Sequence, residues 1–405
     1  MNIEDNEVVI DGNVYNLEAF TNVHPGGRQM LNIFGGKDAT VHYFMLHQHL
    51  KLQEKHLLLH KVRKLHNKSD EYIVNSEAFQ DLKKRIKKSV PYTFATSEWY
   101  IKAVCIMGLN IYLELSNIFY GFSTIKSICL GINMAMIGLC IQHDANHGAV
   151  SAKPWVNILW GYTQDWIGGS SLLWKHHHVL LHHAYTNVND EDPDASSDLI
   201  RLHKLISWKS QYKYQQFYIW FLLPLLPLKW HFAEIWDLYS MEHMDVGISS
   251  MALNEARFSI LLRILFIIRF YIIPLWVYPS IFTLAYILLA LGVGGLYLGF
   301  NFIISHNFLD VTNVVEKNKD WAILQVETSS TVGGRALGFF HGGLNYQIEH
   351  HLFPRISHVH YWKIKPIVQE WCKDYGIKYT HFDNIWHNLV SCYKYMRIMG
   401  AKSDE

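Results

Sequence analysis

The sequence lacks the features that would make it a disulfide-stapled domain or a nucleic-acid-binding protein. It has five cysteines without paired spacing, and three of them fall in apolar stretches: Cys105, Cys129, Cys140, Cys372 and Cys392. We therefore expect no disulfide framework, and we expect the aqueous parts to face a reducing compartment. The formal net charge is only +1, so no excess of positive charge indicates a nucleic-acid partner.

The sequence also lacks an obvious secretory leader and any internal repeat. Residues 1–5 are acidic and contain no apolar run, so we expect no cleavable signal peptide. No low-complexity tract or fixed-period repeat is evident. Half of the residues are hydrophobic, yet 18% are charged. This mixture is typical of a chain that lies partly in a bilayer and partly in water.

Long apolar segments are the first feature that is present. Four segments approach the length of about 20 residues that spans a hydrocarbon core: 100–121, 124–142, 258–278 and 280–305. The turns at 121–125 and 277–282 have no Lys or Arg, whereas residues 51–90 contain eleven. By the positive-inside rule, the N-terminus, the loop 143–257 and the C-terminus are expected in the cytosol.

Two shorter apolar stretches, 155–174 and 217–229, are expected to lie at the membrane interface or to re-enter the membrane. The first 75 residues are expected to form a separate soluble module. In it, β-prone residues flank the turn Asp11-Gly12-Asn13, which predicts a short hairpin. The basic run continues into residues 76–99, which we interpret as a solvated helical linker.

The 25 histidines are unusually frequent and occur in clusters. His143 and His147 follow the second apolar segment, and four-residue spacing on a helix places both imidazoles on one face. A second cluster repeats this spacing at His178 and His182, with His183 adjacent. One such pair is more often a solvated polar pair than a metal site.

Further histidines follow the fourth apolar segment. His306 lies at its end, and Gln347, His350 and His351 form a third cluster. All clusters emerge on the same predicted side of the membrane. Imidazole binds iron, zinc and copper, and eight imidazoles exceed one zinc site, so two metals are the economical interpretation. The predicted ligands are His143, His147, His178, His182, His183, His306, His350 and His351, with Gln347 at or near a metal.

Four neighbouring side chains receive other predicted roles. The carboxylates of Asp144 and Glu349 are expected to orient ligands rather than to bind metal. His176 and His177 are interpreted as spare, solvated or hydrogen-bonded side chains, although a shifted register could recruit His177.

The three clusters, in order and spacing, resemble those of the membrane fatty acid desaturase superfamily. The run GGLNYQIEHHLFP from Gly342 to Pro354 carries Gln347 where most members have histidine, and it resembles the front-end desaturases. The resemblance implies a mainly α, integral membrane four-helix domain with a cytosolic helical cap over residues 100–405. It also implies a di-iron centre that uses O2, because unactivated methylenes cannot be dehydrogenated by acid–base chemistry.

The N-terminal module resembles cytochrome b5. His24-Pro25-Gly26-Gly27 is similar to its haem-binding motif, and His47 follows at family spacing. The resemblance implies a small α+β domain over residues 1–75 in which His24 and His47 ligate haem b axially. Two axial histidines leave no open position and suit electron transfer.

The implied function is front-end desaturation of polyunsaturated fatty acyl chains of the Δ5, Δ4 or Δ6 type, with Δ5 or Δ4 favoured. The substrate would be carried on CoA or phospholipid, and electrons would come from NADH-cytochrome b5 reductase. The implied location is the endoplasmic reticulum membrane, in contact with its lipids. One alternative is a sphingoid-base desaturase of the same subfamily. Another is a non-catalytic membrane b5 electron carrier, which predicts broken histidine clusters.

Overall fold

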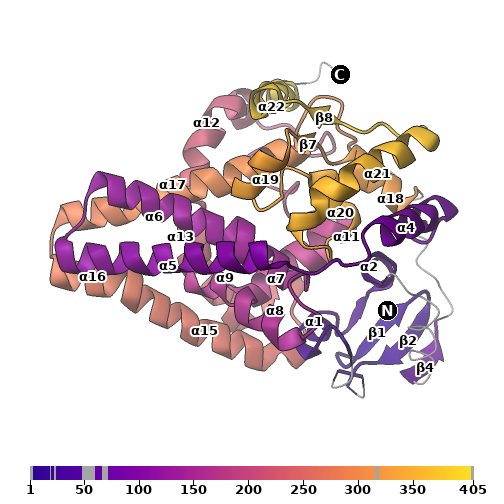
Figure 1. Cartoon of the computed structure of the whole chain (residues 1–405), viewed down its shortest axis with the longest axis horizontal. Coiled ribbons are helices and arrows are strands. Elements are labelled where there is room, and N and C mark those ends of the chain that lie inside the picture. Colours follow the sequence, from indigo (N-terminus) through magenta and orange to yellow (C-terminus); the bar gives the residue numbers. More distant parts are fainter. Residues whose placement is uncertain are drawn as a thin grey trace.

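The computed structural model describes residues 3–18, 20–21, 24–47, 60–65, 72–314 and 319–402. Long helices form one end of the molecule, a small sheet module lies at the other, and shorter helices lie between them (Figure 1). The chain is mainly helical, as predicted. Parts of the basic run, 51–59 and 66–71, lie outside the described residues.

Four helices of the described chain are long and apolar enough to cross a membrane: 97–120, 124–146, 250–277 and 281–306. They comprise α5 (Ser97–Tyr120), α6 (Thr124–Ile137) with η2 (Gly138–Gln142) and α7 (His143–Asn146), η7 (Ser250–Ala252) with α15 (Leu253–Ile267), η8 (Ile268–Ile272) and α16 (Ile273–Val277), and α17 (Ile281–His306). The four predicted spans are therefore confirmed. The third helix begins at Ser250 rather than at 258. Its first turns contain polar residues, so the apolar length of the segment predicts a later start than the helix has.

The spanning helices pack closely against one another, so that their ends lie at the same level. A Cβ on Gly131 of α6 would lie 2.2 Å from the carbonyl oxygen of Ala290 on α17, so glycine lets these two helices approach closely. At the far end, the Tyr278 hydroxyl donates to the carbonyl of Ile118 over 3.2 Å, which ties the two interhelical turns together. Both turns lie at the left of Figure 1. The histidine-bearing ends of α7 and α17 therefore share the opposite side.

Apolar side chains cover the outer face of the spans. Ile101, Val104, Leu261 and Leu265 are among the exposed large residues of α5 and α15. In a water-soluble protein such a surface would be an aggregation site, so its presence on four long helices indicates contact with lipid.

Shorter elements form the cap around the histidines. Between the second and third spans they are α8 (Pro154–Gly161), α9 (Thr163–Trp166), α10 (Ser171–Trp174), η3 (Lys175–His182), α11 (His183–Tyr185), η4 (Ser210–Tyr214), α12 (Gln215–Leu222), η5 (Leu223–Leu225), α13 (Leu226–Leu228), η6 (Lys229–Ala233), α14 (Glu234–Ser240), β5 (Glu242–His243) and β6 (Val246–Gly247). After the fourth span they are α18 (Trp321–Glu327), β7 (Thr331–Val332), α19 (Arg335–Phe340), α20 (Gln347–Leu352), η9 (His358–His360), α21 (Tyr361–Asp374), β8 (His381–Phe382) and α22 (Ile385–Gly400). Trp155, Leu159, Phe217 and Phe221 are exposed, which fits the interfacial position expected for 155–174 and 217–229.

The N-terminal module is a four-stranded sheet of order β3-β1-β2-β4, packed with short helices. It contains β1 (Glu7–Ile10), β2 (Asn13–Asn16), α1 (Arg28–Asn32), β3 (Lys37–Asp38), α2 (Thr40–Leu46) and β4 (Lys61–Lys64). The predicted hairpin is confirmed, with Ile10 opposite Asn13. Asp11 and Gly12 both have positive φ, of 49° and 70°, as a type I′ turn requires.

Helix α4 (Glu77–Ser89) contradicts the interpretation of residues 76–99 as a solvated linker. Lys84, Lys87 and Lys88 do face water, but Phe79, Leu82 and Ile86 are almost completely buried. Phe79 packs on Trp321 and Phe353 with ring centroids 5.5 and 6.1 Å apart. Although the segment has many charges, Phe79, Leu82 and Ile86 form an apolar stripe at helical spacing that packs against the rest of the protein.

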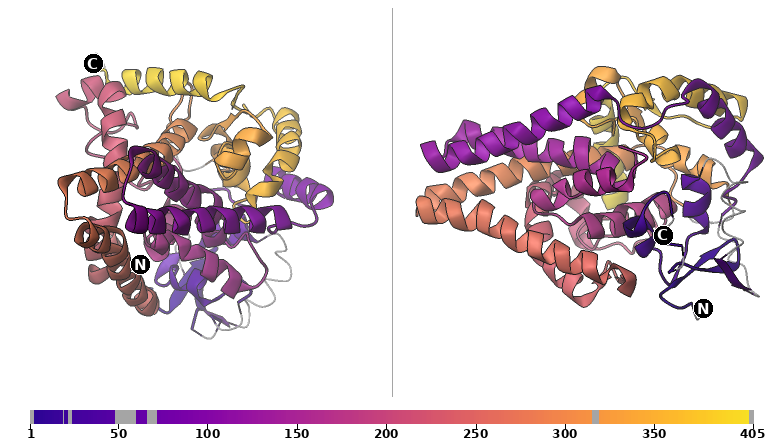
Figure 2. Two further views of the ribbon diagram at one scale, coloured as in Figure 1. Left: turned by 60° about the vertical axis from the view of Figure 1, so that its left-hand side comes forward. Right: turned by 60° about the horizontal axis from the view of Figure 1, so that its bottom comes forward.

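The N-terminal module docks on the helical cap. His42 Nε2 lies 2.9 Å from the carbonyl oxygen of Leu180 in η3, and Asn32 Nδ2 donates to Glu255 Oε1 over 2.9 Å. Tyr43 and Leu180 share one buried apolar cluster. Figure 2 shows the sheet module against the cap in both views. The module therefore sits directly on the helix that carries the second histidine cluster.

Candidate metal and haem sites

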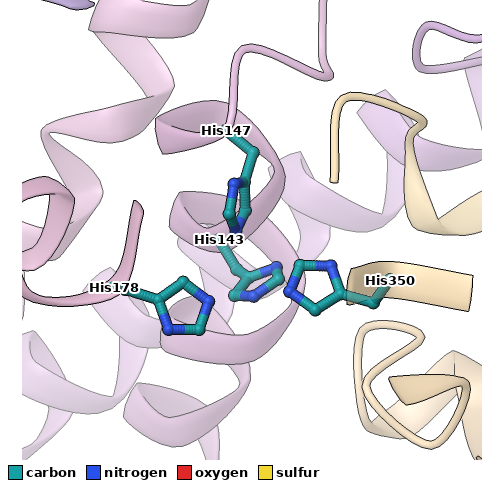
Figure 3. A group of neighbouring side chains, drawn as sticks. All are labelled: His143, His147, His178 and His350. Atoms are coloured by element: carbon teal, nitrogen blue, oxygen red, sulfur yellow. The ribbon is translucent and has the colours of Figure 1, made fainter. Parts of the chain in front are cut away.

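The first group of converging histidines consists of His143, His147, His178 and His350, whose ligand atoms all lie within 4.8 Å of one another. Figure 3 shows their rings gathered from three separate elements, with His143 and His147 on one helix and the other two facing them. The ring centroids of His143 and His350 are 4.4 Å apart. The end of the second span, the cap helix η3 and α20 thus meet at one point.

The second group consists of His182, His306 and His351, again with ligand atoms within 4.8 Å. Gln347 joins it, because its amide nitrogen lies 3.0 Å from His306 Nε2 and 3.2 Å from His351 Nε2. His183 lies between the two groups, with its Nε2 3.0 Å from His350 Nε2. All eight predicted ligands and Gln347 are therefore brought together.

The distribution of the second cluster differs from the four-residue pairing predicted from sequence. His178 and His182, expected to share one metal, fall in different groups, whereas His178 and His183 approach to 3.2 Å between their Nε2 atoms. The reason is that Lys175–His182 forms a π-helix, in which the hydrogen bonds run from i to i+5. The wider turn brings His183, five residues on, to the same side as His178, while the ring of His182 stays 5.2 Å from that of His178 between centroids.

Hydrogen bonds hold four of the rings in one orientation. His182 Nδ1 donates to Asp192 Oδ1 over 3.0 Å, and His351 Nδ1 donates to Gln325 Oε1 over 2.8 Å. In the same way His306 Nδ1 donates to the Thr328 carbonyl at 3.0 Å, and His350 Nδ1 is hydrogen-bonded to the Tyr361 hydroxyl at 3.1 Å. With Nδ1 so engaged, Nε2 of each ring is the atom left to bind a metal, the arrangement usual for metal-bound histidine.

The carboxylates predicted to orient ligands do not contact them. Asp144 accepts hydrogen bonds from Ser357 and from His358 Nδ1, at 2.7 and 2.9 Å. Glu349 accepts from Thr331 Oγ1 and the Tyr379 hydroxyl. Both carboxylates are adjacent in sequence to a predicted ligand, but neighbouring residues on a helix point in different directions, so adjacency does not bring them into contact with that ligand. Asp192, Gln325 and Tyr361 were missed, since no sequence spacing connects them to the clusters.

The site has the electrostatic character of a metal centre. Both ring nitrogens of His143 and of His147 are buried without a hydrogen-bond partner among the described residues. Burial, followed by the neighbouring imidazoles, lowers the pKa of His147, His178 and His183 well below the usual value. These rings are therefore neutral, the state that binds metal.

The spacing of the nitrogens also fits a metal ion. Two imidazole nitrogens bound about 2.1 Å from one ion at tetrahedral or octahedral angles are about 3.0–3.4 Å apart. The Nε2 separations of 3.0 and 3.2 Å around His183 lie in this range. An all-imidazole donor set of this size suits two transition-metal ions, iron among them.

The two spare histidines of the second cluster lie outside both groups. His176 is buried, with Nε2 3.4 Å from the carbonyl oxygen of Gly247, so it is hydrogen-bonded but not solvated. His177 pairs with Asp194 at 2.9 Å and is not recruited by the shifted register.

A cavity of about 350 Å³ opens beside the histidines. Its lining includes His178 and His306 and the indole of Trp174, whose ring centroid is 4.5 Å from that of His178. Apolar or small side chains form most of the wall, among them Ala135, Gly138, Leu223, Leu298, Gly299 and Phe302, while Lys229, Glu234 and His243 line a polar part. Its volume is typical of a small-molecule site.

The N-terminal module places the two predicted haem ligands opposite each other. The ring centroids of His24 and His47 are 6.1 Å apart, which leaves room for one iron about 2 Å from a nitrogen of each ring. His24 Nδ1 is buried without a partner among the described residues, and His47 Nδ1 donates to the Tyr43 carbonyl at 2.9 Å. The residues present fit an axially ligated haem.

Comparison with known proteins agrees with this geometry. The model of the fatty acid desaturase family matches residues 123–383, which cover more than half of the chain. The chain belongs to the fatty acid desaturase family. The model of the cytochrome b5-like heme/steroid binding domain matches residues 4–69. This desaturase is therefore an oxidoreductase fused to a b5-like domain, and it is a membrane protein with four apolar helices.

Several curated desaturases are similar over almost the whole chain. The acyl-lipid (7-3)-desaturase of Rebecca salina is 37% identical, over 97% of this chain and 90% of that protein. A protein of the same name from Diacronema lutheri is 35% identical over the same shares. The acyl-lipid (8-3)-desaturase B of Dictyostelium discoideum is 30% identical over 98% of this chain and 91% of its own length.

Proposed function

We propose that this desaturase introduces a front-end double bond into polyunsaturated acyl chains of membrane lipids, with electrons delivered through the fused b5 module. The observation that carries the proposal is the apolar cavity that begins at His178 and His306, one from each histidine group. An acyl chain in this cavity would present one pair of methylenes to both groups. The names of these similar proteins support an acyl-lipid substrate.

The proposed metal centre is two irons held by His143, His147, His178, His182, His183, His306, His350 and His351, with Gln347 beside the second. When bound, iron supplies the O2-dependent abstraction of hydrogen from unactivated methylenes. The protein's own residues orient the imidazoles, exclude water, and hold the chain in one register. Trp174 lines the cavity beside His178.

The proposal also assigns domain boundaries, an electron donor and a location in the cell. A haem-binding domain occupies residues 1–75, a basic linker that contains α4 occupies 76–99, and the di-iron desaturase domain occupies 100–405. Haem b is held by His24 and His47 and is reduced by NADH-cytochrome b5 reductase. The protein lies in the endoplasmic reticulum membrane with both termini cytosolic. Topology tags near Lys209 and after Lys402 should be accessible from the cytosol, and tags at 122–124 or 278–281 should be protected.

The alternatives have less support. A sphingoid-base desaturase would belong to the same subfamily, but the similar proteins are named for acyl-lipid substrates. A non-catalytic b5 electron carrier would have broken histidine clusters, whereas the eight histidines here converge. Between Δ4, Δ5 and Δ6 insertion, we propose Δ4 or Δ5, and the acyl carrier as a phospholipid rather than CoA.

The test combines product analysis with metal analysis. Cells that express the full chain are fed defined polyunsaturated acids, and the double-bond positions in each lipid class are determined by mass spectrometry. Purified protein should contain two irons per chain. His350→Ala should lose iron and product, whereas the exposed His387→Ala should change neither. Wild-type protein with fewer than two irons, or an active His350→Ala variant, would refute the ligand set.

A further inference from the structure

Two cations, Arg355 in the desaturase domain and Lys83 on α4, lie near the haem ligands without an opposing carboxylate. Arg355 follows the third histidine cluster by four residues, and its guanidinium has no hydrogen bond or ion pair within the described part of the chain. Burial lowers the pKa of Arg355, and no acidic group counters the effect. A partly buried cation without an anion is costly, so a partner that is not part of the polypeptide is expected.

Arg355 lies where the two domains meet. A Cβ on Gly148, the residue after His147, would be 3.8 Å from Arg355 Nε. The haem-ligand loop packs on the same segment, because a Cβ on Gly27 would lie only 2.7 Å from Pro154 Cβ. The loop after the first histidine cluster, Arg355 and the His24 loop are therefore neighbours.

The second cation is Lys83 on α4. Its ammonium group donates to the carbonyl of Phe44 and lies 4.3 Å from the centroid of the Phe79 ring. Burial lowers the pKa of Lys83 to about 8, with no carboxylate nearby to oppose this. Arg355 acts electrostatically on the rings of both His24 and His47, and Lys83 acts on His47, so both cations lie near the haem ligands.

We propose that Arg355 and Lys83 form a cationic cradle for the propionate carboxylates of the haem held between His24 and His47. Haem brings two carboxylates into a pocket that has two cations and, among the described residues, no facing acid. The pairing would fix the haem edge to Arg355, which lies four residues after His351 and beside Gly148, the residue after His147. It would so hold the electron donor against the histidine groups. The inference rests on the haem site of the proposed function.

The test measures haem in the full-length protein and needs no desaturase activity. Haem transfer to apomyoglobin and the haem midpoint potential are compared for wild type, Arg355→Gln, Lys83→Gln and Arg355→Lys. Loss of one charge-assisted hydrogen bond should speed haem transfer about tenfold. The potential should fall, since a positive charge near the iron is removed, and Arg355→Lys should retain part of both properties. The matched control is the exposed Lys84→Gln on the same helix, which should behave as wild type.

A second arm identifies the anion. The chain is produced in a haem-deficient host supplied with haem or with haem dimethyl ester, whose propionates carry no charge. With the ester, wild type and Arg355→Gln should release the cofactor equally fast. A difference that persists with the ester would overturn the proposal and assign Arg355 to another anion, such as a lipid phosphate. Unchanged transfer and potential in Arg355→Gln with normal haem would also overturn it. Wild-type protein that binds no haem would instead refute the haem site itself.

Discussion

Asp192→Asn tests how strongly one buried carboxylate supports the second histidine group. Asp192 is only 1% exposed and shares its oxygens among three donors. Oδ1 accepts from His182 Nδ1 and from the Asp194 backbone at 3.0 Å each, and Oδ2 accepts from the Asn187 backbone at 2.8 Å. Asparagine keeps the shape but replaces one oxygen with a donor, so either the ring or the Asn187 amide loses its acceptor.

The expected loss follows from that contact. A hydrogen bond to a charged group contributes about 1.5–3 kcal/mol, which corresponds to roughly 10–150-fold in affinity. Removal of a group that orients a metal ligand typically costs about 10–100-fold. Both lines of reasoning predict that Asp192→Asn weakens iron binding at the second group by one to two orders of magnitude. Product formation at limiting iron should fall in parallel.

The pH dependence of iron loading provides a second readout. Burial disfavours protonated His182, but Asp192 and Asp194 outweigh burial and raise its pKa to about 9. Iron must displace this proton, so affinity in the wild type should increase with pH up to about 9. With Asp192 neutralised the pKa is lower, and the increase should end at a lower pH.

The assay titrates iron into metal-free full-length protein at several pH values and measures product in parallel. Asp190→Asn is the matched control, because Asp190 lies in the same loop, is exposed, and has a positive φ of 63° that asparagine tolerates. It should bind iron as wild type does. Wild-type iron affinity and an unchanged pH profile in Asp192→Asn would refute the reasoning.

Three further predictions concern the interface, the cavity and the unusual glutamine. Burial lowers the pKa of His42 to about 4, so the unfolded chain takes up its proton first as pH falls. As the pH falls from 7 to 5.5, this difference in pKa should lower the free energy of unfolding by about 1.2 kcal/mol. His42→Phe should remove that part of the pH dependence in thermal unfolding followed by haem absorbance, and an unchanged slope would count against it. Gly138→Leu should fill the cavity beside Leu298, whose Cδ2 would lie 3.1 Å from a Cβ added at that glycine. Conversion of the longest acyl chains should fall most, whereas Gly108→Leu, with no atom within 4 Å, should leave the chain-length profile as in wild type. Gln347→Ala should lose most activity and Gln347→His should retain some, since the amide sits between two ring nitrogens; equal activity of the two variants would contradict this role.

Local patterns in the sequence predicted the elements that depend on neighbours along the chain. The four spans follow from apolar length, since each must cross a hydrocarbon layer of fixed thickness. The hairpin around Gly12 follows from turn chemistry, and the short spacing of His143 and His147 places both rings on one helical face. The membership of all eight histidines in one region followed from their positions at the ends of spans on one predicted side.

Tertiary structure decided how those residues are used. The π-helical turn, which brings His183 beside His178 while His182 joins the other histidine group, arises from backbone hydrogen bonds that no spacing of side chains encodes. Asp192 and Gln325 become ring partners only because distant segments fold against the clusters. The same is true of Arg355, whose neighbours come from both domains. Such contacts join residues far apart in the chain, so their energy depends on packing of the whole protein rather than on any local pattern.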